Sequence, residues 1–161
     1  MTDDNIITST LADFDKFLSA RGLRHTPERY VILRKVLTMN KHFIVERLHE
    51  AIESDGYPLS RATVYNTIQL LTEAGIVRRH QFGNAPAQYE KTLGASMSSH
   101  HHLICSRCGK VKEVKDPAMM KAIGETRYRS FTPDYFTLYV YGTCSACQRQ
   151  LRRKLGDSNK K

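Results

Sequence analysis

Apolar residues recur at helical spacing in four segments of the first half of the chain, which predicts four helices before Gly75. A proline at the first helical position after Thr26 begins the second segment, and Ser60 is an expected N-cap of the fourth. The apolar positions expected to face a core are Leu11, Phe14, Phe17 and Leu18; Tyr30, Leu33, Val36 and Leu37; Val45, Leu48 and Ile52; and Val64, Ile68 and Leu71.

A change to alternating character after Gly75 predicts a β-hairpin. Apolar and polar residues alternate over 76–82, which predicts the first strand. Gly83-Asn84 is the expected turn, and residues 88–90 are expected to form the second strand. Helices followed by such a hairpin favour a winged helix-turn-helix with the fourth helix as the reading helix. A small helical bundle carrying a hairpin is the alternative that the pattern leaves open.

The second half of the chain predicts a small α+β domain. After a linker-like stretch at 92–99, strands are expected at 103–104, 111–114 and 136–141, and a helix at about 117–129. So small a unit exposes an apolar face unless a bound metal stabilises the unit or a second copy of the chain covers that face.

Composition narrows the class of protein. No apolar run approaches the roughly 20 residues of a membrane helix, and the acidic, polar first ten residues are not a secretory signal, so we expect a cytoplasmic protein without a membrane partner. The net charge is +9, of which residues 85–161 carry +8. A polyanion such as nucleic acid is one explanation, and a solvated basic tail from Arg149 onward is the other.

The four cysteines form two Cys-x-x-Cys pairs, Cys105 with Cys108 and Cys144 with Cys147. Two such pairs supply the four thiolates that tetrahedral Zn²⁺ prefers, and disulfides are rare in the cytosol. A redox function needs only one pair, so the pattern favours one structural Zn²⁺ per chain.

Histidines and carboxylates predict a second metal site. His100 and His102 share one face of an extended strand, and His42, Glu90 and Glu113 are candidate further ligands. Nitrogen and oxygen donors of this kind accept Fe²⁺, Mn²⁺ or Zn²⁺. Ordinary surface histidines are the competing interpretation.

The exposed face of the fourth predicted helix carries donors and a ring suited to phosphates and base edges. With Ser60 at its start, the candidate DNA-binding residues are Ser60, Arg61, Thr63, Tyr65, Asn66 and Gln69.

Several segments, in order, resemble the ferric uptake regulator (Fur) family of metal-dependent transcription factors. Residues 22–29, GLRHTPER, are similar to its opening helix, and residues 62–68, ATVYNTI, to its recognition helix. Residues 100–110, HHHLICSRCGK, resemble its signature, and residues 139–144, YVYGTC, its last strand.

The resemblance implies a winged-helix DNA-binding domain at 1–84, a hinge at 85–92, a dimerisation and metal-binding domain at 93–150, and a basic, disordered tail at 151–161. It implies a homodimer that binds an inverted repeat in double-stranded DNA when a regulatory metal is loaded, and that usually represses. Such a protein is not an enzyme and has no small-molecule substrate.

The resemblance also assigns roles. The sensory site falls on His42, Glu90, His100, His102 and Glu113, and the structural zinc site on the four cysteines. Tyr65 falls on the position that contacts bases, and Arg29 lies in the segment near the DNA backbone. Many iron-sensing members have Arg where this chain has Asn66, which leaves the operator sequence open.

Three alternatives are weighed against a metal-responsive, iron-homeostasis repressor. One is a peroxide sensor of the same family, in which bound iron oxidises a histidine ligand. A zinc-ribbon module that binds proteins is another. A metalloenzyme needs an open coordination position and a nucleophile or base, and no such constellation stands out beyond the ligands.

Overall fold

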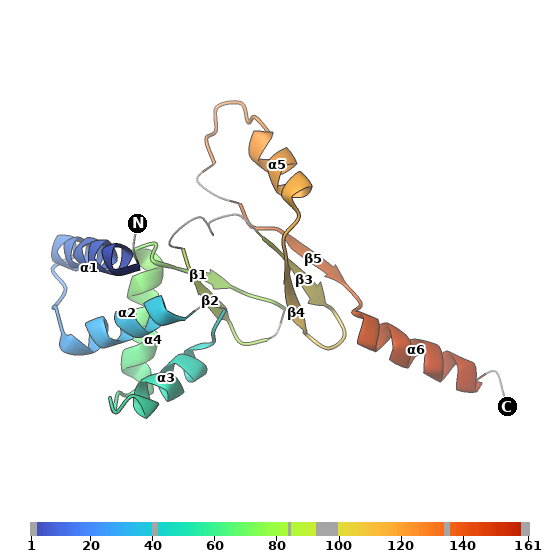
Figure 1. Ribbon diagram of the computed structural model, residues 1–161, viewed down its shortest axis with the longest axis horizontal. Coiled ribbons are helices and arrows are strands. Elements are labelled where there is room, and N and C mark those ends of the chain that lie inside the picture. The colour runs from blue at the N-terminus through green and yellow to red at the C-terminus, as the bar shows by residue number, and fades with distance from the viewer. Residues whose placement is uncertain (1–2, 40–41, 84, 93–99, 134–135, 159–161) are drawn as a thin grey trace. The chain divides into compact units, whose positions relative to one another are not determined.

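The computed structural model describes residues 3–39, 42–83, 85–92, 100–133 and 136–158 (Figure 1). Within these ranges the protein is α+β, with six helices and two small sheets. Its contacts cluster into two units: residues 1–81 with 86–93, and residues 82–85 with 94–161. No helix in the described ranges combines the length and apolar character that crossing a bilayer requires.

The first unit is a helical domain with a two-stranded wing, as the hydrophobic pattern predicts. Its helices are α1 (Asp3–Ala20), α2 (Pro27–Thr38), α3 (Val45–Ser54) and α4 (Arg61–Glu73). Strands β1 (Val77–His80) and β2 (Gln88–Lys91) pair antiparallel, with Arg78 opposite Glu90. The winged helix-turn-helix is therefore confirmed, while Asn84 of the predicted turn lies outside the described residues.

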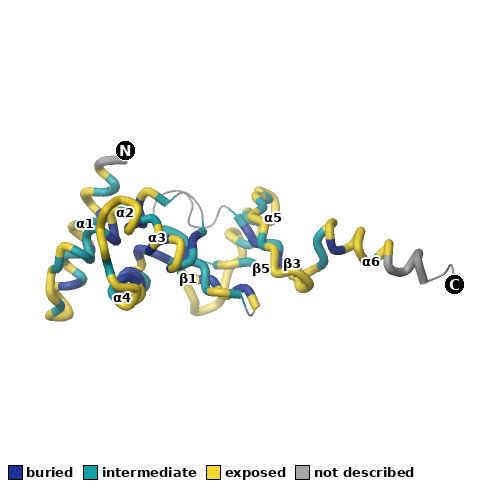
Figure 2. The backbone as a smooth tube through the Cα atoms, turned by 90° about the horizontal axis from the view of Figure 1, so that it is seen from below, coloured by how far each residue is buried: buried dark blue, intermediate teal, exposed yellow. Residues whose placement is uncertain are grey.

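The predicted apolar stripes form the core of this unit, and their buried positions can be followed in Figure 2. Each fully buried Leu, Ile or Phe side chain contributes about 1.5–3 kcal/mol through the hydrophobic effect. Leu11, Phe17 and Tyr30 are only partly buried and pack against this core. The apolar residues at most 1% exposed are Phe14, Leu18, Ile32, Leu33, Val36, Leu48, Ile52, Val64, Ile68 and Leu71.

The helix starts differ in how they are capped. The Ser60 hydroxyl accepts a hydrogen bond from the N–H of Thr63 at 3.1 Å, as expected of an N-cap. Thr26 has the extended backbone of an N-cap, but its side chain makes no capping hydrogen bond. Helix α2 therefore begins with Pro27, whose fixed φ suits the first helical position.

The second unit contains a three-stranded sheet. Strands β3 (His101–Cys105), β4 (Val111–Val114) and β5 (Tyr139–Gly142) lie in the order β4-β3-β5, with β3 antiparallel to β4 and parallel to β5. Helix α5 (Pro117–Glu125) connects β4 to β5, and helix α6 (Ser145–Ser158) follows β5.

Three predicted boundaries in this unit are wrong. Helix α5 ends at Glu125, not near Arg129, because Thr126 turns extended and the chain forms a tight bridge between Tyr128 and Phe131. Strand β5 begins at Tyr139, not Phe136, since pairing with β3 starts only there.

The third wrong prediction is that a disordered basic tail begins at residue 151. Residues 151–158 continue helix α6, whose described side chains are largely exposed (Figure 2). Residues 93–99 of the predicted linker and the last three residues, 159–161, lie outside the described residues.

Candidate metal centres and nucleic-acid interface

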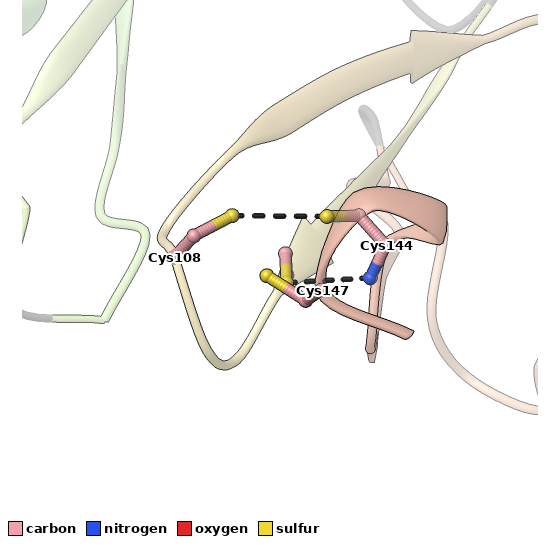
Figure 3. A group of neighbouring side chains, drawn as sticks. Cys108, Cys144 and Cys147 are labelled. Carbon is pink, nitrogen blue, oxygen red and sulfur yellow. Dashed lines mark hydrogen bonds between the residues drawn. The ribbon is translucent and has the colours of Figure 1, made fainter. Parts of the chain in front are cut away.

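The four cysteines converge at the end of the second-unit sheet. Cys105 ends β3, and Cys108 stands in the turn to β4, where Gly109 adopts a φ of +71°. Cys144 immediately precedes α6, and Cys147 lies in the first turn of that helix, which follows β5, the parallel neighbour of β3. The fold thus brings together sulfurs from two distant segments, all within 4.8 Å of one another (Figure 3).

The separations between the sulfurs fit a tetrahedral zinc site. Four sulfurs at about 2.3 Å from a zinc ion stand about 3.8 Å apart. The Sγ atoms of Cys108 and Cys144 are 3.8 Å apart (Figure 3). Cys105 and Cys147 are buried, whereas Cys108 is exposed, so the group lies at the surface with two of its sulfurs shielded.

Backbone amides already favour a thiolate in this group. The N–H of Cys144 donates to Sγ of Cys105 at 3.3 Å, and with the N–H groups of Cys108 and Arg107 it lowers the pKa of Cys105 to about 6. The neighbouring sulfurs of Cys144 and Cys108 raise the pKa of Cys147 to about 12. Four thiolates at this distance repel one another, which a divalent cation relieves.

The first unit holds a second group of metal-binding side chains around Glu90. An isolated bridge joins Phe43 to Tyr89 through two hydrogen bonds of 2.9 and 2.8 Å, and so holds the segment before α3 against β2. Nε2 of His42 consequently lies 3.1 Å from Oε2 of Glu90. His80, at the end of β1, places its Nε2 2.9 Å from Oε1 of the same carboxylate.

Glu90 is charged in spite of its burial. Burial opposes its ionisation, but hydrogen bonds from His42 and His80 outweigh that effect and hold the pKa of Glu90 well below its ordinary value. Arg78 adds a guanidinium whose Nη1 is 3.4 Å from Oε1. The carboxylate is therefore an anionic centre among three nitrogen-bearing side chains.

The second unit presents the remaining predicted ligands on its sheet. The rings of His100 and His102 have centroids 4.9 Å apart, which fits the expected shared face. Glu113 on β4 pairs in register with His102. His102 is 2% exposed and packs against Tyr139, with ring centroids 5.7 Å apart. The predicted sensory residues thus come from both units: His42 and Glu90 belong to the first, and His100, His102 and Glu113 to the second.

The reading helix exposes most of the residues predicted to contact DNA. Arg61, Tyr65, Asn66 and Gln69 are exposed, whereas Thr63 is half-buried. The hydroxyl of Ser60 is engaged in the cap of α4.

Several predicted DNA-binding residues have intramolecular partners, among them Tyr65 and Arg29. The phenol of Tyr65 donates to Oε1 of Glu46 at 2.5 Å, which raises the pKa of Tyr65 and lowers that of Glu46. Arg29 donates from its guanidinium to the carbonyl of Arg24. The acceptor beside the reading helix is an acidic side chain of α3.

Comparison with known proteins identifies the family to which this chain belongs. The model of the ferric uptake regulator family matches residues 20–141, which include the wing, both His/Glu groups and the first cysteine pair. The chain belongs to the ferric uptake regulator family. That family consists of metal-responsive transcription regulators, so regulation and not turnover is the general function of its members.

Similar proteins within the family include regulators of different stimuli. The ferric uptake regulation protein of Synechococcus elongatus is 32% identical over 148 residues, which cover 90% of this chain and 99% of that protein. The peroxide-responsive repressor PerR of Staphylococcus aureus is 26% identical over 132 residues, 81% of this chain and 86% of that protein.

A solved structure agrees with the fold. The ferric uptake regulator of Pseudomonas aeruginosa, determined with manganese, matches with a TM-score of 0.67 and 28% identity, covering 81% of this chain and 97% of that one. Membership of the family therefore rests on sequence and fold together, whereas the signal that each relative answers differs.

The contact of His80 with Glu90 is not predictable from the sequence pattern. His80 pairs with Gln88, so Glu90 is its diagonal neighbour across the hairpin, on the face it shares with Arg78. A one-residue change of register would move His80 to the opposite face. Only the actual pairing of β1 with β2 reveals the contact.

Proposed function

We propose that this chain is a homodimeric, metal-activated repressor that binds an inverted repeat in double-stranded DNA and controls genes of metal homeostasis, iron in particular, in the cytoplasm. It acts by binding and not by catalysis. The proposal rests on the contact of His42, before α3, with Glu90, which lies on the wing that accompanies the reading helix in the DNA-binding unit. A cation held there changes the charge of the DNA-binding unit itself.

The cysteines and the His/Glu residues bind metals with different functions, one structural and one regulatory. Cys105, Cys108, Cys144 and Cys147 hold one structural Zn²⁺ per chain, because four converging thiols suit that ion. The exchangeable regulatory metal, Fe²⁺ with Mn²⁺ or Zn²⁺ as substitutes, is assigned to the two groups of histidines and carboxylates. Its ligands are His42, Glu90, His100, His102 and Glu113.

Activation follows from differential affinity. The regulatory metal binds more tightly to the DNA-competent arrangement than to the incompetent one, and so shifts the population toward it. A coupling free energy of about 1–3 kcal/mol raises DNA affinity by roughly 5- to 150-fold.

Recognition and assembly use different units. Residues Arg61, Tyr65, Asn66 and Gln69 read the DNA, while Arg29 and Ser60 lie near its backbone. Exposed aromatic side chains of the second unit favour pairing with a second copy, because a small domain rarely leaves several such rings to solvent. They include Tyr128, Phe131 and Tyr141, which are 51%, 66% and 54% exposed.

The test is a metal-by-metal DNA titration. Zinc-loaded protein, kept anaerobic, is used to select duplexes from a random library in the presence of Fe²⁺ or Mn²⁺. We expect the selected duplexes to contain an inverted repeat and to bind at least about fivefold more tightly with the metal than without it. His42→Ala should abolish the difference, and His25→Ala, at an exposed histidine, should preserve it. Equal binding with and without metal would overturn the proposal.

A peroxide sensor is the second candidate function, favoured by the likeness to PerR of Staphylococcus aureus. Two histidines and a carboxylate around one metal are also the donor set of oxygen-activating iron proteins. Mass spectrometry of the iron-loaded protein after peroxide treatment separates the two functions. One added oxygen atom on His42, His100 or His102, with loss of DNA binding, would establish peroxide sensing. Unmodified histidines would leave metal sensing as the function.

A further inference from the structure

His80 is a buried histidine to which the sequence pattern assigns no role. Its side chain is 1% exposed, and its Nε2 lies 2.9 Å from Oε1 of Glu90. His42 approaches the other oxygen of that carboxylate, with Nε2 3.1 Å from Oε2. Two imidazole nitrogens therefore meet one carboxylate in the first unit, where His42 and Glu90 are 9% and 14% exposed.

These separations are those of neighbouring donors around one metal ion. Nitrogen and oxygen ligands bind first-row metals at about 2.1 Å, so two donors at a right angle stand about 3.0 Å apart. The rings of His42 and His80 have centroids 5.2 Å apart and are inclined by 67°. They do not stack on each other, and both turn a nitrogen toward Glu90.

We propose that His80 is a further ligand of the regulatory metal, so that His42, His80 and Glu90 supply two imidazoles and one carboxylate from the DNA-binding unit to a divalent first-row metal. This inference rests on the proposed function, which it deepens by adding a ligand from the wing. The donor set suits Fe²⁺ in particular. A metal bound in this way contacts strand β1 directly, because His80 is the last residue of that strand.

Arg78 is a built-in competitor of the metal. Its Nη1 lies 3.4 Å from Oε1 of Glu90, the same oxygen that His80 contacts, and its side chain is only 14% exposed. A guanidinium and a divalent cation at one poorly hydrated carboxylate repel each other strongly. Metal binding therefore disfavours the present position of Arg78 on β1, and removal of its charge should strengthen metal binding.

The decisive experiment is nitrogen NMR of histidine rings in the wild-type, full-length protein. Protein that carries one Zn²⁺ at its cysteines is titrated with a further equivalent of Zn²⁺. We expect the Nε2 resonance of His80, assigned through backbone correlations, to move to the position of a metal-bound nitrogen together with that of His42. A His80 ring unchanged while His42 shifts would overturn the proposal, since His80 would then only orient Glu90.

Affinity measurements supply the second arm. Zn²⁺ competition against a chelating dye should show His80→Gln and His42→Gln each binding at least about tenfold more weakly than wild type, and Arg78→Gln binding more tightly. His49→Gln is the matched control, because His49 is also buried, at 8% exposure, but its Nε2 meets the carbonyl oxygen of Leu59 at 2.7 Å and not Glu90. Wild-type affinity in His80→Gln would contradict the proposal.

The two proposals fail separately. Wild-type protein whose DNA binding ignores metal would refute the proposed function, while the His80 resonance would still show whether His80 is a ligand. Should His80→Gln not fold, the wild-type spectrum alone decides the question of ligation, and Arg78→Gln gives an independent change in the opposite direction.

Discussion

At the scale of single residues, the reading helix carries an unusual pairing. Tyr65 is 46% exposed, yet its hydroxyl is held by Glu46 at 2.5 Å. The carboxylate fixes the direction of the ring, which favours selective contact with a base. It also places a negative charge beside the surface proposed to meet DNA phosphates. The Glu46 carboxylate therefore favours DNA binding by orienting Tyr65 and opposes it through its negative charge.

Substitution of Glu46 separates these two effects. Glu46→Gln keeps an oxygen that accepts from Tyr65 but removes the charge, so we expect binding to operator and to unrelated DNA to strengthen equally, by about two- to tenfold at low salt. Glu46→Ala also removes the acceptor, so the ratio of operator to unrelated binding should fall. Fluorescence anisotropy with both duplexes measures each affinity.

The control for this pair is Glu125→Gln, which removes one exposed negative charge from helix α5 in the second unit. It should leave both affinities close to wild type. Weaker DNA binding by Glu46→Gln would contradict the repulsion, and an unchanged ratio in Glu46→Ala would contradict the orienting role.

Residue type alone was enough to propose some ligands and insufficient for others. His42 and Glu90 stand out because imidazole and carboxylate are metal donors, and the structure places them 3.1 Å apart. His80 and Arg78 share a face with Glu90 only in the actual hairpin register. Glu46 is an ordinary acidic residue in the sequence, and nothing there connects it to Tyr65, nineteen positions away.

At the scale of elements, helix α1 is attached to the DNA-binding domain by polar contacts as well as by its apolar face. The hydroxyl of Tyr30 on α2 donates to the carboxylate of Asp15 on α1. His25, in the connection between the helices, lies 2.8 Å from that hydroxyl through Nδ1 and 3.1 Å from Ser19 through Nε2. Arg21 also forms an ion pair with Glu73 of α4.

The Tyr30–Asp15 contact makes the docking of α1 dependent on pH. The hydrogen bond from Tyr30 lowers the pKa of Asp15, so its stabilising effect is present above about pH 4 and is lost as the pH falls through the folded value. Burial and Asp15 raise the pKa of Tyr30 to about 12. At the alkaline end, the effect is therefore lost as the pH rises from about 10 toward the folded value.

We expect Tyr30→Phe to lower the urea midpoint of unfolding most between about pH 5 and pH 9, with the difference from wild type shrinking toward about pH 2 and above about pH 11. Tyr57→Phe serves as control, because the Tyr57 ring is 50% exposed. Its small effect should not vary with pH. A constant difference for Tyr30→Phe over the whole range would contradict the assigned contact.

Elements with an apolar stripe are the predictable ones. Helices α2, α3 and α4 each place such a stripe on a shared core, so periodicity alone locates them. Helix α6 has only a narrow stripe of Cys147, Leu151 and Leu155, and its cationic run resembles a solvated tail. The helix starts at the cysteine turn, where the N–H of Gln148 donates to the carbonyl of Cys144 at 2.9 Å. Its existence depends on that tertiary start.

At the scale of the whole molecule, the two units depend on different forces. The first contains a continuous core of buried apolar side chains from four helices and the wing. The second buries few apolar residues among those described: Phe82, Ile104, Cys105 and Cys147. Apolar burial is therefore abundant in one unit and sparse in the other, where zinc ligation and pairing with a second copy are the available sources of stability.

Removal of the structural zinc should consequently unfold the second unit selectively. Ligand convergence couples metal affinity to folding, and structural zinc binding carries on the order of 10–16 kcal/mol in small domains. We expect Cys108→Ser to lose the tightly held zinc. Amide exchange should then become fast at hydrogen bonds such as His102 N–H to Leu138, while amides of Leu48 and Leu71 in the first unit stay protected.

Ser106→Ala is the matched control, because it alters the same turn without removing a sulfur. It should keep one zinc per chain, measured by elemental analysis, and wild-type exchange in β3 and β5. Protected β3 amides in zinc-free Cys108→Ser would show that the sheet holds without the metal. Exchange that became fast in both units together would instead show that the first unit's core depends on the second, which its own buried helices argue against.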